Sequence, residues 1–168
     1  MQRPRLDEAG GRAVEEAAAE AAEHFRTYSW YPQRAGRADL AVPHAQRAHR
    51  AGDPRVRQEL ARLHSLQRVS TWTAERAKAA RALGRPPGAE GSIGKLALSN
   101  VARQAARVHA LVAGANGLLA GTEAAAPFDG LIAEVLISVP AQSIAGGTDE
   151  IQRNILGCLL YTSDAADE

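Results

Sequence analysis

Apolar side chains recur every three or four positions along two long stretches of the chain. The first stretch follows Asp53 and carries Val56, Leu60, Leu63, Leu66, Val69 and Thr73. The second begins near Ser92 and carries Ile93, Leu96, Val101, Ala105, Val108 and Val112. This spacing gathers the apolar side chains on one face of an α-helix. It predicts two long helices that bury between them Val56, Leu60, Leu63, Leu66, Ile93, Leu96, Val101 and Val108.

Residues with known capping preferences mark the ends of both helices. Asp53 is placed to cap the first helix, and Pro54 suits its first position because that position needs no amide hydrogen. Gly84 is expected to end the first helix, and Gly114 the second. A first helix of about thirty residues would be a rod about 45 Å long, at 1.5 Å per residue.

Shorter helical segments are predicted on either side of this pair. An Ala- and Glu-rich helix covers residues 12–28, and a second segment continues to about Arg50. Pro43 should bend that segment or begin a new first turn. Another helix starts near Pro127 and is disrupted at Pro140.

The C-terminal part of this pattern ends in a turn and a short helix. Residues 143–148 are predicted to form the turn, and Thr148 to cap a last helix over residues 149–156. No segment alternates apolar and polar residues long enough to be a strand. The fold class predicted is therefore all-α, an antiparallel helix bundle. Residues 12–157 form this domain, residues 1–11 a flexible start, and residues 158–168 an atypical tail.

Composition favours the same fold. Hydrophobic residues make up 45% of the 168 residues but aromatic ones only 4%, so the apolar content is largely Ala, Leu and Val. Alanine is the strongest helix former, and small residues allow helices to pack closely. Five histidines show no metal-ligand spacing, and Cys158 stands alone, so no metal site is expected: His24, His44, His49, His64 and His109.

Charge and hydropathy exclude several classes of protein. The net charge is only +1, which argues against a general nucleic-acid binder. Nine arginines from Arg26 to Arg68 face three acidic residues, and they either solvate a helical surface or bind the phosphates of a ligand. No apolar run of about 18 residues could span a membrane, and no secretory signal is present. A cytoplasmic protein is expected.

Residues 144–156, Ile-Ala-Gly-Gly-Thr-Asp-Glu-Ile-Gln-Arg-Asn-Ile-Leu, resemble the closing motif of the acyl-CoA dehydrogenases. Residues 53–63, the Trp-Thr-Ala at 72–74 and residues 91–96 follow the order of that family. The resemblance implies a four-helix C-terminal domain through which subunits form dimers and tetramers. It also implies FAD as cofactor and an acyl-CoA thioester as the substrate of α,β-dehydrogenation. The family's N-terminal helical domain and middle β domain are not recognised in this sequence.

The resemblance also implies roles for individual residues. Thr148 and Glu150 match positions that touch FAD, and Gly147 matches a glycine beside the reacting thioester. Four further positions match contacts to the FAD of a neighbouring subunit: Arg47, Gln58, Gly114 and Gly117. Near the two glycines, Leu111 stands where the family usually has a glutamine.

The departure from the family pattern is Gly146, which occupies the position of the usual catalytic glutamate. A glycine cannot accept a proton. Either Glu23 supplies the base from the first helix, or a partner chain supplies it in a mixed tetramer, and the mixed tetramer is the preferred hypothesis. A catalytically silent subunit, or a helical assembly module without flavin, is the alternative function. Residues 158–168 depart from the family pattern, so a non-native tail on a gene fragment is expected.

Overall fold

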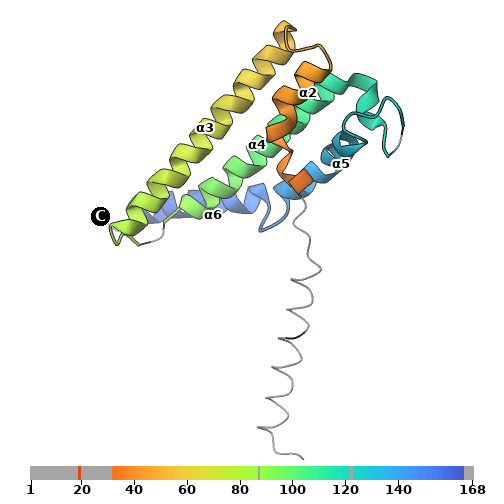
Figure 1. The fold of residues 1–168 in the computed structure, drawn as a ribbon. Coiled ribbons are helices and arrows are strands. Elements are labelled where there is room, and N and C mark those ends of the chain that lie inside the picture. The colour runs from red at the N-terminus through yellow and green to blue at the C-terminus, as the bar shows by residue number, and fades with distance from the viewer. Residues whose placement is uncertain (1–18, 20–31, 87, 122, 165–168) are drawn as a thin grey trace, which may run out of the picture. The chain divides into compact units, whose positions relative to one another are not determined.

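The computed structural model describes residue 19 and residues 32–86, 88–121 and 123–164 (Figure 1). Over these residues the chain is helical and contains no strand, so the predicted all-α class is confirmed. The predicted helix over residues 12–28, the start at residues 1–11 and the candidate base Glu23 lie outside the described residues, apart from residue 19. The helices are α2 (Ala41–Arg47), α3 (Pro54–Ala82), α4 (Glu90–Ala113), α5 (Leu131–Ser138) and α6 (Asp149–Asp164).

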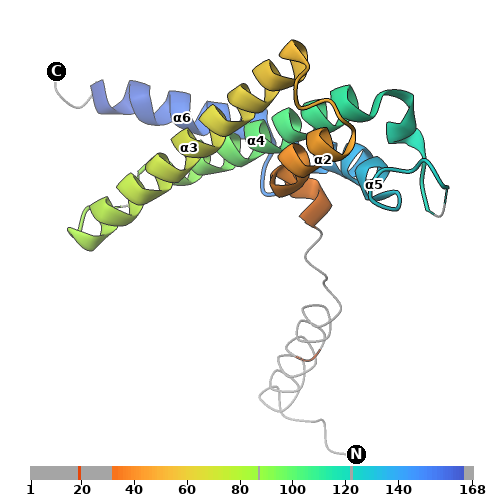
Figure 2. The same ribbon diagram turned by 45° about the horizontal axis from the view of Figure 1, so that its top comes forward.

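Helix α4 is the central element. It packs along α3 in the opposite direction and also contacts α2, α5 and α6, as two views of the ribbon show (Figures 1 and 2). The described residues also form four short 3-10 helices: η1 (Pro32–Ala35), η2 (Ala38–Leu40), η3 (Gly114–Leu118) and η4 (Val139–Ser143). None of the helices among the described residues is both long and apolar enough to cross a membrane.

The predicted start of α3 is confirmed in detail. The Asp53 side chain accepts hydrogen bonds from the amides of Arg55 at 2.9 Å and Val56 at 3.4 Å, and Pro54 occupies the first turn. These bonds satisfy amides that a helix start otherwise leaves unpaired. The helix ends at Ala82, and Gly84 follows with a φ of +72°, in the left-handed region that glycine adopts without strain.

The main apolar core joins the first half of α3 to the second half of α4, and α2 covers it. It consists of Ala41, Ala45, Val56, Leu63, Ala105, Val108 and Val112, with Leu60 and Val101 packed against it. These residues confirm most of the predicted stripes. The prediction is wrong for two residues of the stripes, because Ile93 is 40% exposed and Val69 is 54% exposed.

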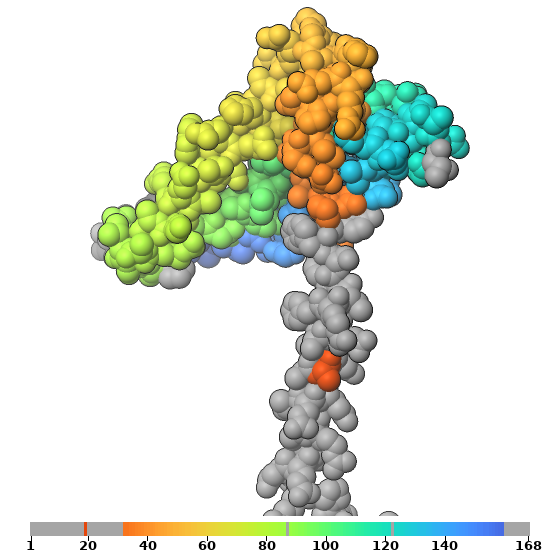
Figure 3. Space-filling model, in the orientation of Figure 1, coloured from red at the N-terminus to blue at the C-terminus, as the bar shows by residue number. Residues whose placement is uncertain are grey.

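Ile93 and Val69 are exposed because the two ends of the helix pair are covered differently. Helix α2 lies over one end of α3 and α4, whereas the side of α3 toward the other end is open to solvent (Figure 3). Small residues such as Ala77 and Ser92 are buried there instead of large ones. Helical periodicity specifies an apolar stripe, but it does not specify whether a further element covers the whole stripe.

The remaining boundaries differ from the prediction at three places. The segment before Arg50 is divided into η1, η2 and α2, because Gly36 and Arg37 have positive φ angles, although Pro43 does lie in the first turn of a new helix. Helix α5 begins at Leu131 rather than Pro127, since residues 128–130 all have positive φ and cannot continue an α-helix.

The last helix is longer than predicted. Helix α6 starts at Asp149, as expected, but it continues to Asp164 instead of ending near Leu156. Gly157 lies just after that point, and one glycine costs a helix only about 1 kcal/mol relative to alanine. Residues 158–164 are therefore part of α6.

Candidate functional site

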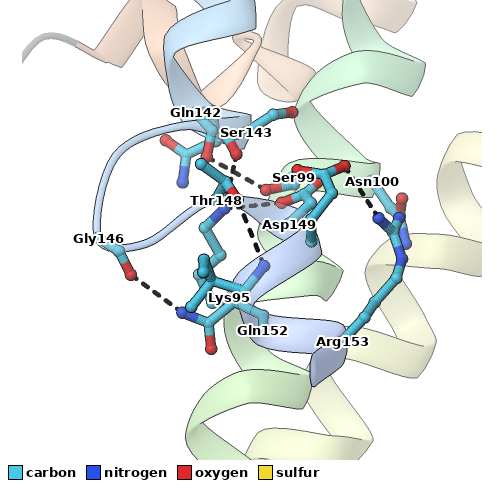
Figure 4. Close-up of polar contacts among 12 residues, drawn as sticks. Lys95, Ser99, Asn100, Gln142, Ser143, Gly146, Thr148, Asp149, Gln152 and Arg153 are labelled. Carbon is cyan, nitrogen blue, oxygen red and sulfur yellow. Dashed lines mark hydrogen bonds and ion pairs between the residues drawn. The ribbon is translucent and has the colours of Figure 1, made fainter. Parts of the chain in front are cut away.

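A tight turn precedes α6 and carries the residues that match the family's closing motif. Gly146 and Gly147 have φ angles of +70° and +86°, a conformation that side chains disfavour. At Gly147 an added Cβ would also lie 2.9 Å from Nε2 of Gln152, so only glycine fits without displacement. Thr148 then caps α6, because its hydroxyl accepts a hydrogen bond of 3.3 Å from the amide of Ile151 (Figure 4).

The first residue of α6, Asp149, is a buried carboxylate bound to two cations of α4. Lys95 Nζ lies 2.6 Å from one carboxylate oxygen, and Arg103 Nη1 lies 2.6 Å from the other. Burial raises the pKa of Asp149, but hydrogen bonds from Lys95 and Arg103 outweigh burial and hold the pKa well below its usual range. Asp149 is therefore ionised with both oxygens in use, and it is not an available proton acceptor.

Further hydrogen bonds tie the preceding segment to α4 and α6. Lys95 Nζ also donates to the carbonyl of Ser143 at 3.1 Å, and Arg103 donates to the Ser143 hydroxyl. Gln152 Nε2 donates to the carbonyl of Gly146 at 3.0 Å from within α6 (Figure 4). Lys95 and Arg103 of α4 therefore hold the residue before the turn, and Gln152 of α6 holds the turn itself.

The second carboxylate near the turn is exposed. Glu150 pairs with Arg153 at 3.3 Å on the surface of α6. Hydrogen bonds from a backbone amide and from the Thr148 hydroxyl lower the pKa of Glu150. At Gly146 an added Cβ would meet no atom within 4 Å, so the space above this residue is open. The turn therefore offers neither a carboxylate at Gly146 nor an unengaged one beside it.

A second group of predicted residues lies at the other end of α4. The Arg47 guanidinium lies 4.5 Å from the centre of the Phe128 ring, a cation–π contact. Both side chains line a cavity of about 320 Å³ with His44 and Asn116. Gly114 ends α4 with a φ of +56°, and Gly117 is buried, where an added Cβ would lie 3.2 Å from the Ala113 side chain.

A buried histidine pair that the sequence did not predict lies at this end of α4, and one of its members, His44, lines the cavity. The Nδ1 atoms of His44 and His109 are 3.0 Å apart, and Nε2 of His109 lies 3.1 Å from the carbonyl of Arg37. That carbonyl only accepts, so His109 carries its hydrogen on Nε2, and His44 must donate from Nδ1. Burial, with a smaller contribution from His109, lowers the pKa of His44 to about 4. The sequence feature that could have indicated this pair is that His44 and His109 each stand between small or apolar residues.

Gln58 is separate from both groups. It lines a groove of about 620 Å³ with Arg55, Glu59, Arg107 and Leu111, whereas Arg47 lines the cavity beside Phe128. Arg47 and Gln58 therefore line two separate hollows. The described part of the chain also has no group of three His, Cys, Asp or Glu side chains that could hold a metal ion.

Comparison with known proteins agrees with the residues gathered at the turn. A family model described as acyl-CoA dehydrogenase, C-terminal domain, matches residues 12–159. No match is found among curated proteins. A crystal structure of the ChsE4-ChsE5 complex from Mycobacterium tuberculosis is similar over 67% of this chain, with 25% sequence identity and a TM-score of 0.56. This chain spans 29% of the length of the matched chain. The chain belongs to the family of acyl-CoA dehydrogenase C-terminal domains.

Proposed function

We propose that this chain is the C-terminal helical part of a cytoplasmic, FAD-dependent acyl-CoA dehydrogenase. The complete enzyme would introduce a double bond between the α and β carbons of an acyl-CoA thioester. When bound, FAD would take the hydride from the β-carbon while a carboxylate removes the α-proton. The observation that carries the proposal is the family match over residues 12–159, which includes the glycine turn before α6.

The described residues fit a flavin nucleotide at two places. At the turn, Gly146 leaves open space, and Gly147, Thr148 and Glu150 would contact the flavin and thioester of the same subunit. At the other end of α4, Arg47, Gly114 and Gly117 would approach the FAD of a neighbouring subunit. A guanidinium suits phosphate oxygens, and a glycine turn allows close backbone approach. Gln58 would make its contact from the separate groove along α3.

The two places lie near opposite ends of α4. Ser99, beside the turn, and Ala113, beside the Arg47 cavity, are fourteen residues apart in one helix, which corresponds to about 21 Å at 1.5 Å per residue. In the proposed oligomer this domain would serve its own active site and a neighbour's, as the family resemblance implies.

The catalytic base is proposed to come from outside the turn. Asp149 is bound by two cations, Glu150 is exposed and paired, and Gly146 has no side chain. The preferred source is a partner chain in a mixed tetramer, and the alternative is Glu23. The hetero-complex named for the similar crystal structure supports the first source.

Assembly through the helix bundle has its own support. Several large apolar side chains on the far half of α3, just after it and on α4 are exposed, namely Val69 at 54%, Trp72 at 52%, Leu83 at 75% and Ile93 at 40%. Isolated exposed apolar residues are common, but several along one helix pair are typical of a subunit interface. A homo- or hetero-oligomer, dimer or tetramer, would cover them.

The main test uses the complete protein that contains this domain. We expect it to purify, alone or with its partner, with a flavin absorption spectrum that acyl-CoA bleaches without oxygen. The 168-residue chain alone should bind FAD poorly and show no activity, since flavin sites in this family are built from two domains and two subunits. Stoichiometric flavin on the isolated chain would contradict this division of the site.

A second test locates the base. Replacing Gly146 with Glu in the complete protein should create an additional competent site if flavin and substrate already fit, with Gly146→Gln as the inactive control of similar size. Space for the side chain is open, and the positive φ costs about 1–2 kcal/mol. If Glu23 is the base, the unmodified homo-oligomer is active and Glu23→Gln lowers its rate by orders of magnitude.

The second candidate function is a catalytically silent subunit or assembly module, which the glycine at position 146 favours. It predicts that the complete protein carries no flavin that acyl-CoA reduces, yet co-purifies with an active dehydrogenase and raises its stability. An active protein without a partner would exclude this role.

A further inference from the structure

The two cations of α4 each contact both ends of the segment that forms the glycine turn. Lys95 binds the Ser143 carbonyl at one end and Asp149 Oδ1 at the other. Arg103 binds the Ser143 hydroxyl and Asp149 Oδ2. The turn lies between these ends, at residues 144–148 (Figure 4). Each cation therefore joins the two ends of the turn, as well as joining the turn to α4.

The ion pairs of Asp149 with Lys95 and Arg103 are partly shielded from water, which strengthens the attraction between the charges. The side chain of Asp149 is 3% exposed and that of Lys95 is 13% exposed, whereas Arg103 is 42% exposed and closes the outer side. Ser99 adds a bond of 3.2 Å to the Gln142 carbonyl from the same face of α4. Removing one partner of a shielded ion pair leaves the other charge without its counterpart, which is costly.

The turn itself contains little that would hold its shape. Gly146 and Gly147 are exposed, and glycine has more backbone freedom to lose than any other residue. Apart from the Gln152 bond to the Gly146 carbonyl and the Ile151 amide bond to the Thr148 hydroxyl, the side-chain contacts that bound the turn come from α4. The conformation of the turn thus depends on residues about fifty positions earlier in the chain.

We infer that Lys95 and Arg103, acting through Asp149 and Ser143, are positioning residues that hold the Gly146–Gly147–Thr148 turn in the conformation that receives a ligand. The ligand role rests on the proposed function, since Gly147 and Thr148 are the proposed contacts to thioester and flavin. The positioning itself depends only on the contacts between α4 and the two ends of the turn.

The test measures amide hydrogen exchange in the 168-residue chain at two bonds that join the turn to the residues on either side of it. The Ala145 amide donates to the Ala141 carbonyl at 2.9 Å, and the Gln152 amide donates to the Thr148 carbonyl at 3.0 Å. Lys95→Met should accelerate exchange of these amides about tenfold or more by local opening, while amides around Leu63 in α3 keep their rates. Lys95→Arg retains the charge and should restore rates to within about threefold.

Two further variants keep the test decisive. Leu63→Ala weakens the apolar core without touching the turn, so it should accelerate the α3 amides and leave the Ala145 amide near its original rate. Ser143→Ala removes only the Arg103 hydroxyl contact and should give a smaller acceleration than Lys95→Met, even if the latter folds poorly. Unchanged turn exchange in both Lys95→Met and Ser143→Ala would overturn the inference, as would equal acceleration of the turn by Leu63→Ala.

A flavin measurement separates this inference from the proposed function. In the complete protein, Lys95→Met should weaken FAD binding about tenfold in titrations followed by flavin fluorescence, and Leu63→Ala should not. Accelerated turn exchange with unchanged FAD affinity would support the positioning of the turn and contradict its assignment as a flavin contact. Unaltered exchange would contradict the positioning whatever the flavin result.

Discussion

The two ends of α4 are held by different kinds of interaction. Its second half is packed by apolar side chains, with Ala105, Val108 and Val112 buried against α2 and α3. Its first half and middle hold the loop before α6 through Lys95, Ser99 and Arg103, whose partners lie 40 to 54 residues away. The apolar end sets the stability of the bundle, and the polar end sets the shape of a turn. The predictions below test this division.

The largest effect is expected at the apolar end. Leu63 is 2% exposed within the main core, so Leu63→Ala removes buried methyl groups and leaves a cavity. We expect the free energy of unfolding to fall by about 2–5 kcal/mol. Urea denaturation followed by circular dichroism measures it. A loss below about 1 kcal/mol would show that this end is not tightly packed.

The same end should respond to mild acid through its histidine pair. Because folding lowers the pKa of His44 from 6.5 to about 4, the unfolded chain binds a proton first as the pH falls. Stability should therefore be full above about pH 6.5 and decrease toward pH 4, by up to about 3 kcal/mol at 1.36 kcal/mol per pKa unit. His44→Gln should flatten this part of the pH dependence, and His64→Gln, at an exposed site on α3, should not. Denaturation at a series of pH values would decide it.

At the polar end, Asp149→Asn should cost about 1–3 kcal/mol at neutral pH, since two charge-assisted hydrogen bonds lose their anionic acceptor. Folding lowers the pKa of Asp149, so its contribution is present above the unfolded pKa of about 3.9 and is lost as the pH falls further. This loss follows the histidine transition at lower pH. If Asp149→Asn instead changed the loss of stability between pH 6.5 and 4, the apolar and polar ends of α4 would not be independent.

The smallest effect is expected at the uncovered part of the α3 stripe. Val69 is 54% exposed, so Val69→Ala should change the free energy of unfolding by no more than about 0.5 kcal/mol in the monomer. A cost that approaches that of Leu63→Ala would mean that this surface is buried. If the cost appears only at high protein concentration, a second subunit covers it, which sedimentation velocity would show.

Local sequence features were sufficient for the two long helices. The Asp53 cap, Pro54 and the spacing of Val56, Leu63 and Val108 act within one helix or between adjacent ones. The glycines and Thr148 similarly indicated a turn and a helix start. These predictions succeeded because capping and helical periodicity depend on residues a few positions apart.

Tertiary structure decided what periodicity leaves open. It left Val69 and Ile93 exposed, since α2 covers only one end of the helix pair. The assembly of His44 with His109, and of Lys95 with Asp149, also required the complete fold, because these side chains are 65 and 54 residues apart. The sequence by itself therefore determined the helices and the turn, which follow from short-range physics. Only the tertiary structure decided which polar side chains meet, because their pairing depends on how the helices pack around α4.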